Sequence, residues 1–178
     1  MASSIPASAP LSVCLELTRA ISGTAHVEQI FEAALQALES GLGVRRASIL
    51  LFDPDGVMRF KAWRGLSEQY RAAMAGHTPW RAGQRGARPL VVEDVAGDPS
   101  LAPHLPLFRT EGIASLAFIP LESADGVIGK FMLYGAEPRG FSAQELQLAE
   151  LIAAQVAFAV TREQSTRASQ QLAAIVET

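Results

Sequence analysis

The chain has 178 residues, a net charge of −3, and a composition that is 49% apolar and 19% charged. This length suits one domain with terminal extensions, and this composition supports a packed core and argues against overall disorder. The small negative charge gives no electrostatic reason to expect nucleic acid as a partner.

Cysteine content and the N-terminal segment bear on location. Cys14 is the one cysteine of the chain, so neither an internal disulfide nor a cysteine-based zinc site can form, which favours a reducing compartment. Residues 1–10 are rich in Ser, Ala and Pro and lack the pattern of a secretory signal, and no run approaches the roughly 20 apolar residues that cross a bilayer. We therefore expect a cytoplasmic chain without membrane insertion, whose first ten residues are disordered.

Two amphipathic helices come first. The first helix ends at Ser22-Gly23, and its apolar residues recur at helical spacing: Leu11, Leu15, Leu17 and Ile21. The second covers residues 26–41, with Thr24 as a candidate N-cap and two glycines, Gly41 and Gly43, at its end. Its single apolar stripe predicts packing on a sheet.

A hairpin follows. Residues 47–52 are continuously apolar, which is typical of a strand covered on both faces. Residues 53–56 read Asp-Pro-Asp-Gly, a turn in which Pro fixes φ and Gly takes the fourth position. Residues 58–63 then alternate between apolar and polar side chains, except for the tryptophan at their end, as in a half-exposed strand.

The middle of the chain is rich in loops. Ser67 can cap a short helix that runs to Met74, and residues 76–88 predict a long loop. A short strand at 89–92 precedes an irregular stretch, 94–106, and a helical turn at 107–111. Residues 114–121 and 127–134 form a second predicted hairpin.

The last helix has a clear start signature. Ser142 and Glu145 form a capping box, and Phe141 with Leu146 can form a hydrophobic staple. If the helix is continuous from Ala143 to Val176, it spans about 50 Å. That length exceeds what a small domain can cover, so its far end calls for a further partner.

Three segments, in the right order, resemble motifs of the GAF domain family: ASILLFDPDGVMRFKAWRGLS (47–67), RPLVVEDVAGDPSLA (88–102), and the stretch from Gly112 to Val160. The resemblance implies a GAF-like αβα sandwich of the α+β type, with a mainly antiparallel sheet. Helices 26–41 and 142–160 would cover one face, and a loop-roofed pocket the other. The chain would then comprise a disordered segment (1–10), the GAF domain (11–160) and a helical linker (161–178).

The resemblance also carries functional expectations. The tail, residues 171–178, is similar to the start of a PAS sensor domain, which implies a longer protein, a sensor histidine kinase of a two-component system. The domain itself is expected to be non-catalytic, to receive a small-molecule signal and to relay it through dimeric helices. The alternative is a ligandless module for dimerisation and relay. An enzyme is disfavoured, because no pair of base and nucleophile is visible.

The pocket of the resembling family lies between the sheet and the middle loops. The residues placed there as candidate ligand contacts are Trp63, Arg64, Tyr70, Trp80, Asp94, Phe108, Arg109, Ser115, Phe118 and Lys130. The competing interpretation is that the aromatic side chains fill the core and the charges are solvated. Lys130 is the most informative, because its strand is otherwise apolar: its amine either meets a pocket anion or a nearby acid, or reaches water along an apolar surface.

The sequence names no cofactor and leaves room for an unidentified small molecule. Haem and bilin are not expected, because Cys14 precedes the sheet and the three histidines, 26, 77 and 104, are scattered along the chain. The same scatter predicts no metal site. The Asn-Lys-Phe-Asp-Glu pattern of cyclic-nucleotide-binding relatives is absent.

A homodimer is expected, together with downstream signalling domains in the same chain. In the resembling family, terminal helices pair across a two-fold axis. The residues expected in or near that seam are Leu11, Leu15, Ile152, Val156, Ala159, Val160, Leu172 and Ile175.

Overall fold

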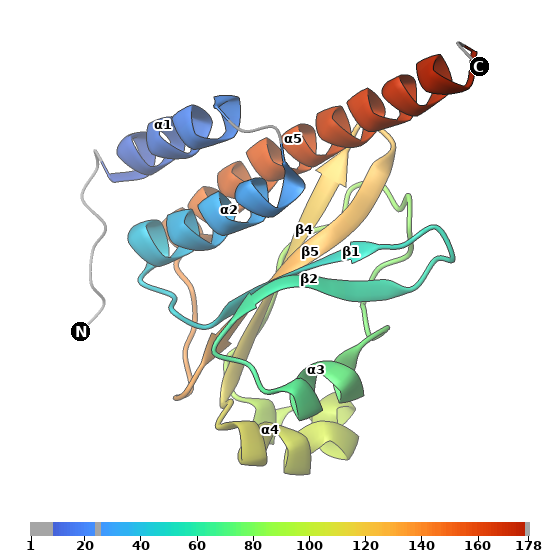
Figure 1. Ribbon diagram of the computed structural model, residues 1–178. Helices are drawn as coiled ribbons and strands as arrows, with labels where there is room; N and C mark the ends of the chain where they lie inside the picture. The colour runs from blue at the N-terminus through green and yellow to red at the C-terminus, as the bar shows by residue number, and fades with distance from the viewer. Residues whose placement is uncertain (1–8, 24–25, 177–178) are drawn as a thin grey trace.

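The computed structural model describes residues 9–23 and 26–176 and has three layers (Figure 1). Helices α1 (Ala9–Ser22), α2 (Val27–Leu42) and α5 (Ala143–Val176) lie on one side of a five-stranded sheet. The short helices α3 (Glu68–Met74) and α4 (Leu105–Glu111) lie on the other side, with the 3₁₀ helices η1 (Val95–Gly97) and η2 (Pro99–His104). The expected αβα sandwich is confirmed.

Every pairing in the sheet is antiparallel. Its strands are β1 (Ala47–Phe52), β2 (Met58–Arg64), β3 (Leu90–Val92), β4 (Ser115–Ser123) and β5 (Gly126–Gly135), in the order β2-β1-β5-β4-β3. Both predicted hairpins are present. The β1–β2 register shifts between Ile49 and Leu50, a bulge that reverses the faces of the residues beyond it.

The helix boundaries follow from local chemistry. Ser67 accepts a hydrogen bond from the amide of Tyr70 and starts α3. At the start of α5, the Ser142 amide donates to the Glu145 carboxylate at 2.8 Å, and the Glu145 amide donates to Ser142 Oγ at 3.2 Å, so the predicted capping box is confirmed. Thr24, the predicted N-cap of α2, lies outside the described residues.

Two apolar cores lie on the two faces of the sheet. The helix-side core joins α1, α2 and α5 to alternate residues of the strands, including Ile49, Ile119 and Phe131. The second core contains the strand residues between them, including Leu50, Leu116 and Met132, together with side chains of α3 and α4. Strand alternation therefore divides one sheet between a helical layer and a loop-rich layer.

Two predictions about the chain's irregular parts need correction. Residues 94–106 contain η1, η2 and the start of α4, because Asp94 and Asp98 each accept a backbone hydrogen bond that caps a 3₁₀ helix. The disordered segment was expected to reach residue 10, but Ala9 and Pro10 already belong to α1. Residues 1–8 lie outside the described part of the chain.

The predicted dimer seam is wrong for four residues of α5. Ile152, Val156, Ala159 and Val160 are at most 1% exposed, because this side of α5 packs within the same chain. The other four expected seam residues are exposed: Leu11, Leu15, Leu172 and Ile175.

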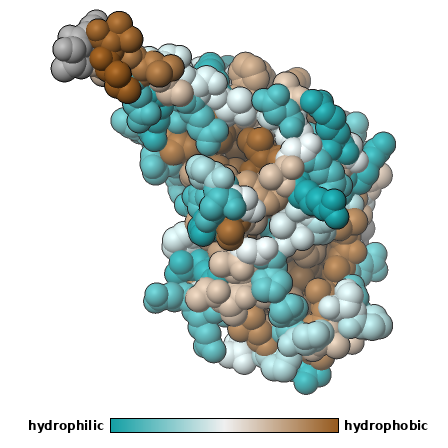
Figure 2. Space-filling view, turned by 90° about the vertical axis from the view of Figure 1, so that its right-hand side faces the viewer, coloured by the Kyte–Doolittle hydropathy of each residue, from teal (hydrophilic) through white to brown (hydrophobic). Residues whose placement is uncertain are grey.

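Helix α5 is continuous from Ala143 to Val176, which the sequence left open, and it runs past the sheet (Figure 1). Beyond Val160, the last buried residue, the part from Thr161 to Val176 spans about 24 Å. Figure 2 shows apolar atoms at the end of this projection. Val176, the last residue of α5, is 85% exposed. None of the helices in the described ranges is both long and apolar enough to cross a membrane.

Candidate functional site

A cavity of about 450 Å³ lies between the sheet and the loop-rich layer. Its floor is formed by strand side chains, among them Leu50, Phe60, Leu116, Phe118, Lys130 and Met132. Its roof and walls come from α3, the loop after it, η2 and α4. A mostly apolar cavity of this size with a few polar groups is the usual form of a small-molecule site.

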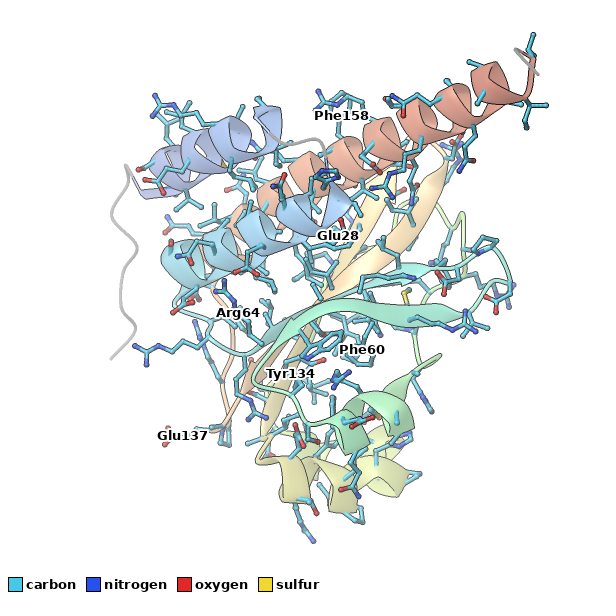
Figure 3. The ribbon with its side chains drawn as sticks, in the orientation of Figure 1. Glu28, Phe60, Arg64, Tyr134, Glu137 and Phe158 are labelled. Carbon is cyan, nitrogen blue, oxygen red and sulfur yellow. The ribbon has the colours of Figure 1, made fainter. Side chains whose placement is uncertain are left out.

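Period-2 alternation decides which strand residues reach the cavity. On β5, Lys130, Met132 and Tyr134 share the cavity face, while Phe131 and Leu133 pack in the helix-side core. Figure 3 shows Phe60 and Tyr134 on the side of the sheet that faces α3 and α4.

Lys130 places a charge in the cavity floor. It is 3% exposed, and among the described residues it is the one charged residue classed as buried. Its Nζ donates to the main-chain carbonyl of His77 at 2.7 Å and lies 5.2 Å from the centre of the Phe118 ring. Burial lowers the pKa of Lys130 to about 8, because the apolar surroundings disfavour the charged form.

Tyrosine hydroxyls are buried beside the cavity. Tyr134 Oη and Ser48 Oγ lie 2.8 Å apart, and the Tyr70 ring meets the Tyr134 ring edge-on at 5.7 Å. Burial raises the pKa of both tyrosines, so their hydroxyls stay neutral at physiological pH. Both residues also line the cavity.

The roof carries a pair of histidines. The rings of His77 and His104 meet edge-on with their centres 4.9 Å apart. Asp98 lines the same region, and its Oδ1 accepts hydrogen bonds from both the amide and the hydroxyl of Ser100. No group of three or more His, Cys, Asp or Glu side chains in the described ranges is arranged to hold a metal ion.

The structure brings together four of the ten predicted contact residues. Those lining the cavity are Tyr70, Phe108, Phe118 and Lys130. Histidines 77 and 104, which the sequence placed in the roofing loops, also line it.

Trp63 and Arg64 lie outside the cavity lining, contrary to the sequence-based placement. The Arg64 side chain extends to α2, where it donates to Glu39 at 2.9 Å and pairs with Glu32 (Figure 3). The extra residue of the bulge is Lys61 on β2, opposite Ile49 and Leu50, and it moves Arg64 to the helix side of the sheet. Trp63 lies under the Arg71 guanidinium, 3.8 Å from the ring centre.

The other four predicted contacts also have different positions. Trp80 is buried but does not line the cavity, and Asp94 caps η1. Arg109 is exposed on α4. Ser115 is buried and donates to the carbonyl of Glu137 at 2.8 Å, so its hydroxyl is used at the end of the sheet.

Several cavity residues were missed by the sequence analysis. They are mainly strand side chains and one helix residue: Leu50, Phe60, Met74, Leu116, Met132 and Tyr134. Alternation starting from Lys130 would have found Met132 and Tyr134.

Comparisons with known proteins identify relatives in signalling systems. A domain assigned to a two-component sensor histidine kinase of Sinorhizobium meliloti 1021 is 40% identical, with a TM-score of 0.75, and the match covers 82% of this chain and 98% of that one. The Nif-specific regulatory protein of Azorhizobium caulinodans is 27% identical over 119 residues. That match covers 64% of this chain but only 19% of the regulatory protein.

The expectation that excluded haem and bilin is overturned. A phycoerythrobilin-bound GAF domain from a cyanobacterial phytochrome has a TM-score of 0.69 at 20% identity, covering 91% of this chain and all of that one. A further structure of the same fold, at 18% identity and a TM-score of 0.68, has bound biliverdin and covers 85% and 99%. Domains of this fold can therefore hold a bilin. Cys14 lies on α1 in the helical layer and does not line the cavity, so the cavity offers no thiol for a covalent bond.

The family assignment rests on the whole span of the domain. A family model described as GAF domain matches residues 24–161, from just before α2 to just past Val160, the last buried residue of α5. The 40% identical sensor-kinase domain and the order of the five strands agree with this match. The chain therefore belongs to the GAF domain family.

Proposed function

We propose that this chain is a non-catalytic sensory domain of a longer cytoplasmic signalling protein, in which a small molecule binds the sheet-side cavity and α5 relays its presence. The observation that carries the proposal is the cavity of about 450 Å³, apolar along most of its lining and with one buried ammonium in its floor. The sensor-kinase domain and the Nif-specific regulator among the relatives support a regulatory role.

Strand β4 offers a short path from the cavity to α5. Leu116 and Phe118 line the cavity, while their neighbours Ala117 and Ile119 face the helix-side core, where α5 packs on β4. A ligand that displaces β4 would thus act on α5 through packed side chains. Its effect is limited to its difference in affinity between the two arrangements.

The exposed face of α5 supports a homodimer. Residues spaced alternately three and four apart, the heptad pattern of a helical seam, run along it: Leu151, Ala154, Phe158, Thr161, Ser165, Ala168, Leu172 and Ile175. Phe158 is 68% exposed and points away from the sheet (Figure 3). Leu11 and Leu15 on α1 are exposed as well. We propose that a second copy covers this stripe and that α5 leads into a further module, such as a PAS or kinase domain.

The dimer is tested by two matched glutamate substitutions. Leu172→Glu puts a charge in the stripe, whereas Gln170→Glu puts the same charge on the opposite side of the helix. Sedimentation should show a dimer for the wild type and Gln170→Glu, and a monomer or a much weaker dimer for Leu172→Glu. Equal dissociation of both variants, or a monomeric wild type at high concentration, would contradict the seam.

Ligand reception is tested by native mass spectrometry of the purified chain, with a denatured sample as reference. A non-covalent extra mass, lost on denaturation, would support the sensory function. A bare dimer would favour the second candidate, a ligandless relay module, which the long exposed stripe of α5 supports independently of the cavity. An absorption spectrum after incubation with biliverdin shows whether the cavity accepts a bilin.

A further inference from the structure

Lys130 has hydrogen-bonding capacity that the protein does not use. An ammonium has three donors, and one of them is directed to the His77 carbonyl. No ion pair within 4 Å joins Lys130 to any described carboxylate, and burial alone accounts for its lowered pKa. A buried charge without an acidic partner is costly, so a ligand that brings the missing negative charge would be stabilised at this point.

We infer that the cavity takes a monocarboxylate with an apolar body, whose carboxylate accepts hydrogen bonds from the Lys130 ammonium. This inference rests on the proposed sensory function and specifies the class of its ligand.

The charge count of the cavity favours a monoanion. Lys130 is the one basic side chain other than histidine in the lining, and no arginine is present there. A second negative charge on the ligand would find no further lysine or arginine to pair with, would meet the Asp98 carboxylate in the same lining, and would not be balanced by the two neutral tyrosine hydroxyls. The rings of His77 and His104 lie in the roof. A phosphate dianion would usually be met by several donors or an arginine fork, which this floor lacks.

The rest of the floor selects an apolar body. Around Lys130 lie Leu50, Phe60, Phe118 and Met132, none of which can hydrogen-bond a polar substituent through its side chain. An aliphatic or aromatic acid would bury its hydrocarbon there and leave its charge on the ammonium. Binding would also affect the roof segment at His77, because the same ammonium donates a hydrogen bond to the His77 carbonyl.

The chain offers an unusually clean assay, since Lys61 and Lys130 are its only lysines. We would label lysine with ¹³C at Cε and record NMR spectra while adding hexanoate or benzoate, with hexanamide and benzamide as neutral partners of the same shape. The carboxylates should shift the Lys130 signal and raise its titration midpoint above pH 8. The signal of Lys61, which is exposed on β2 and paired with Asp53, should not shift when they are added. The amides should leave that midpoint in place.

Affinities of substituted proteins for the acids and the amides give a second test. In Lys130→Met the preference for acid over amide, expected to be about tenfold to a hundredfold in the wild type, should disappear, whereas Lys61→Met should keep it. Amides that bind as tightly as acids to the wild type would overturn this inference and leave the sensory function standing. The cavity could also prove empty, with no acid or amide bound and no small molecule retained in native mass spectrometry. In that case both the monocarboxylate inference and the proposed sensory function would fail.

Discussion

Replacing Lys130 by methionine should stabilise the ligand-free domain at neutral pH. Methionine is close in shape to the lysine stem and carries no charge, so it suits the apolar floor between Leu50 and Phe118. The wild-type ammonium is kept there against its tendency to be hydrated, which is why its pKa falls to about 8.

The size of the effect follows from that pKa. The difference between the ordinary value of 10.5 and about 8 corresponds to about 3 kcal/mol for holding the charge in the fold. The substitution also removes the hydrogen bond to the His77 carbonyl, a loss of about 1 kcal/mol. The net gain at pH 7 is therefore about 2 kcal/mol, or roughly 4–8 °C in Tm for a chain of this size.

The pH dependence supplies the assay. Between pH 8 and 10.5 the unfolded chain keeps its lysine proton while the folded chain loses it, so wild-type stability rises with pH through this window by up to about 1.4 kcal/mol per unit. Lys130→Met lacks this rise, and its advantage should vanish by about pH 9.5. Urea unfolding from pH 7 to 9.5 measures the free energy of unfolding of both proteins across this window. At higher pH, Tyr70 and Tyr134 would lower stability as pH rises, because their pKa values are raised in the folded state.

Lys61→Met is the control, because this exposed lysine pairs with Asp53 at the surface. It should change the free energy of unfolding by no more than about 1 kcal/mol. A Lys130→Met variant that is less stable than the wild type at pH 7, or that keeps a constant advantage up to pH 9.5, would refute the burial argument.

Three further substitutions test the fold. Ser142→Ala removes half of the capping box with Glu145 and should lower the free energy of unfolding by about 1 kcal/mol in urea; an unchanged value would mean that the cap contributes nothing. Arg64→Met breaks the ion pair with Glu39 on the helix side of the sheet, so it should lower the free energy of unfolding by about 1 kcal/mol. Calorimetry should show an unaltered affinity for any cavity ligand. Gly126 has a φ of 98°, and a Cβ added there would clash with the Gly83 carbonyl oxygen. Gly126→Ala should therefore lower the free energy of unfolding by at least about 2 kcal/mol, and an unchanged Tm would contradict this turn geometry.

The sequence was sufficient for features whose cause is local. The start of α5 needed only Ser142, Glu145 and their spacing. The first hairpin needed an apolar run, a turn with Pro and Gly, and an alternating strand, and all of these lie within 18 residues, 47–64. The same applies to the serine that caps α3.

The candidate site depended on contacts between segments far apart in the chain. Simple alternation puts Arg64 on the same face as Phe60, and only the bulge opposite Ile49 and Leu50 turns it toward α2. Lys130 was noticed because a charge interrupts an apolar strand. Its bond to His77, 53 residues earlier, comes from the folded roof.

Helix α5 shows the same division. Its apolar positions could be identified from spacing alone, but two apolar stripes run along it, and spacing does not say which partner each one meets. The tertiary structure decides this, because α2 and β4 already cover Ile152 and Val156 and leave Phe158 exposed. The sequence thus determined the main helices and strands, through caps, turns and periodicity, although it missed the 3₁₀ helices η1 and η2. Only the packing of those segments against one another determined which side chains are in the core, in the cavity or at the surface.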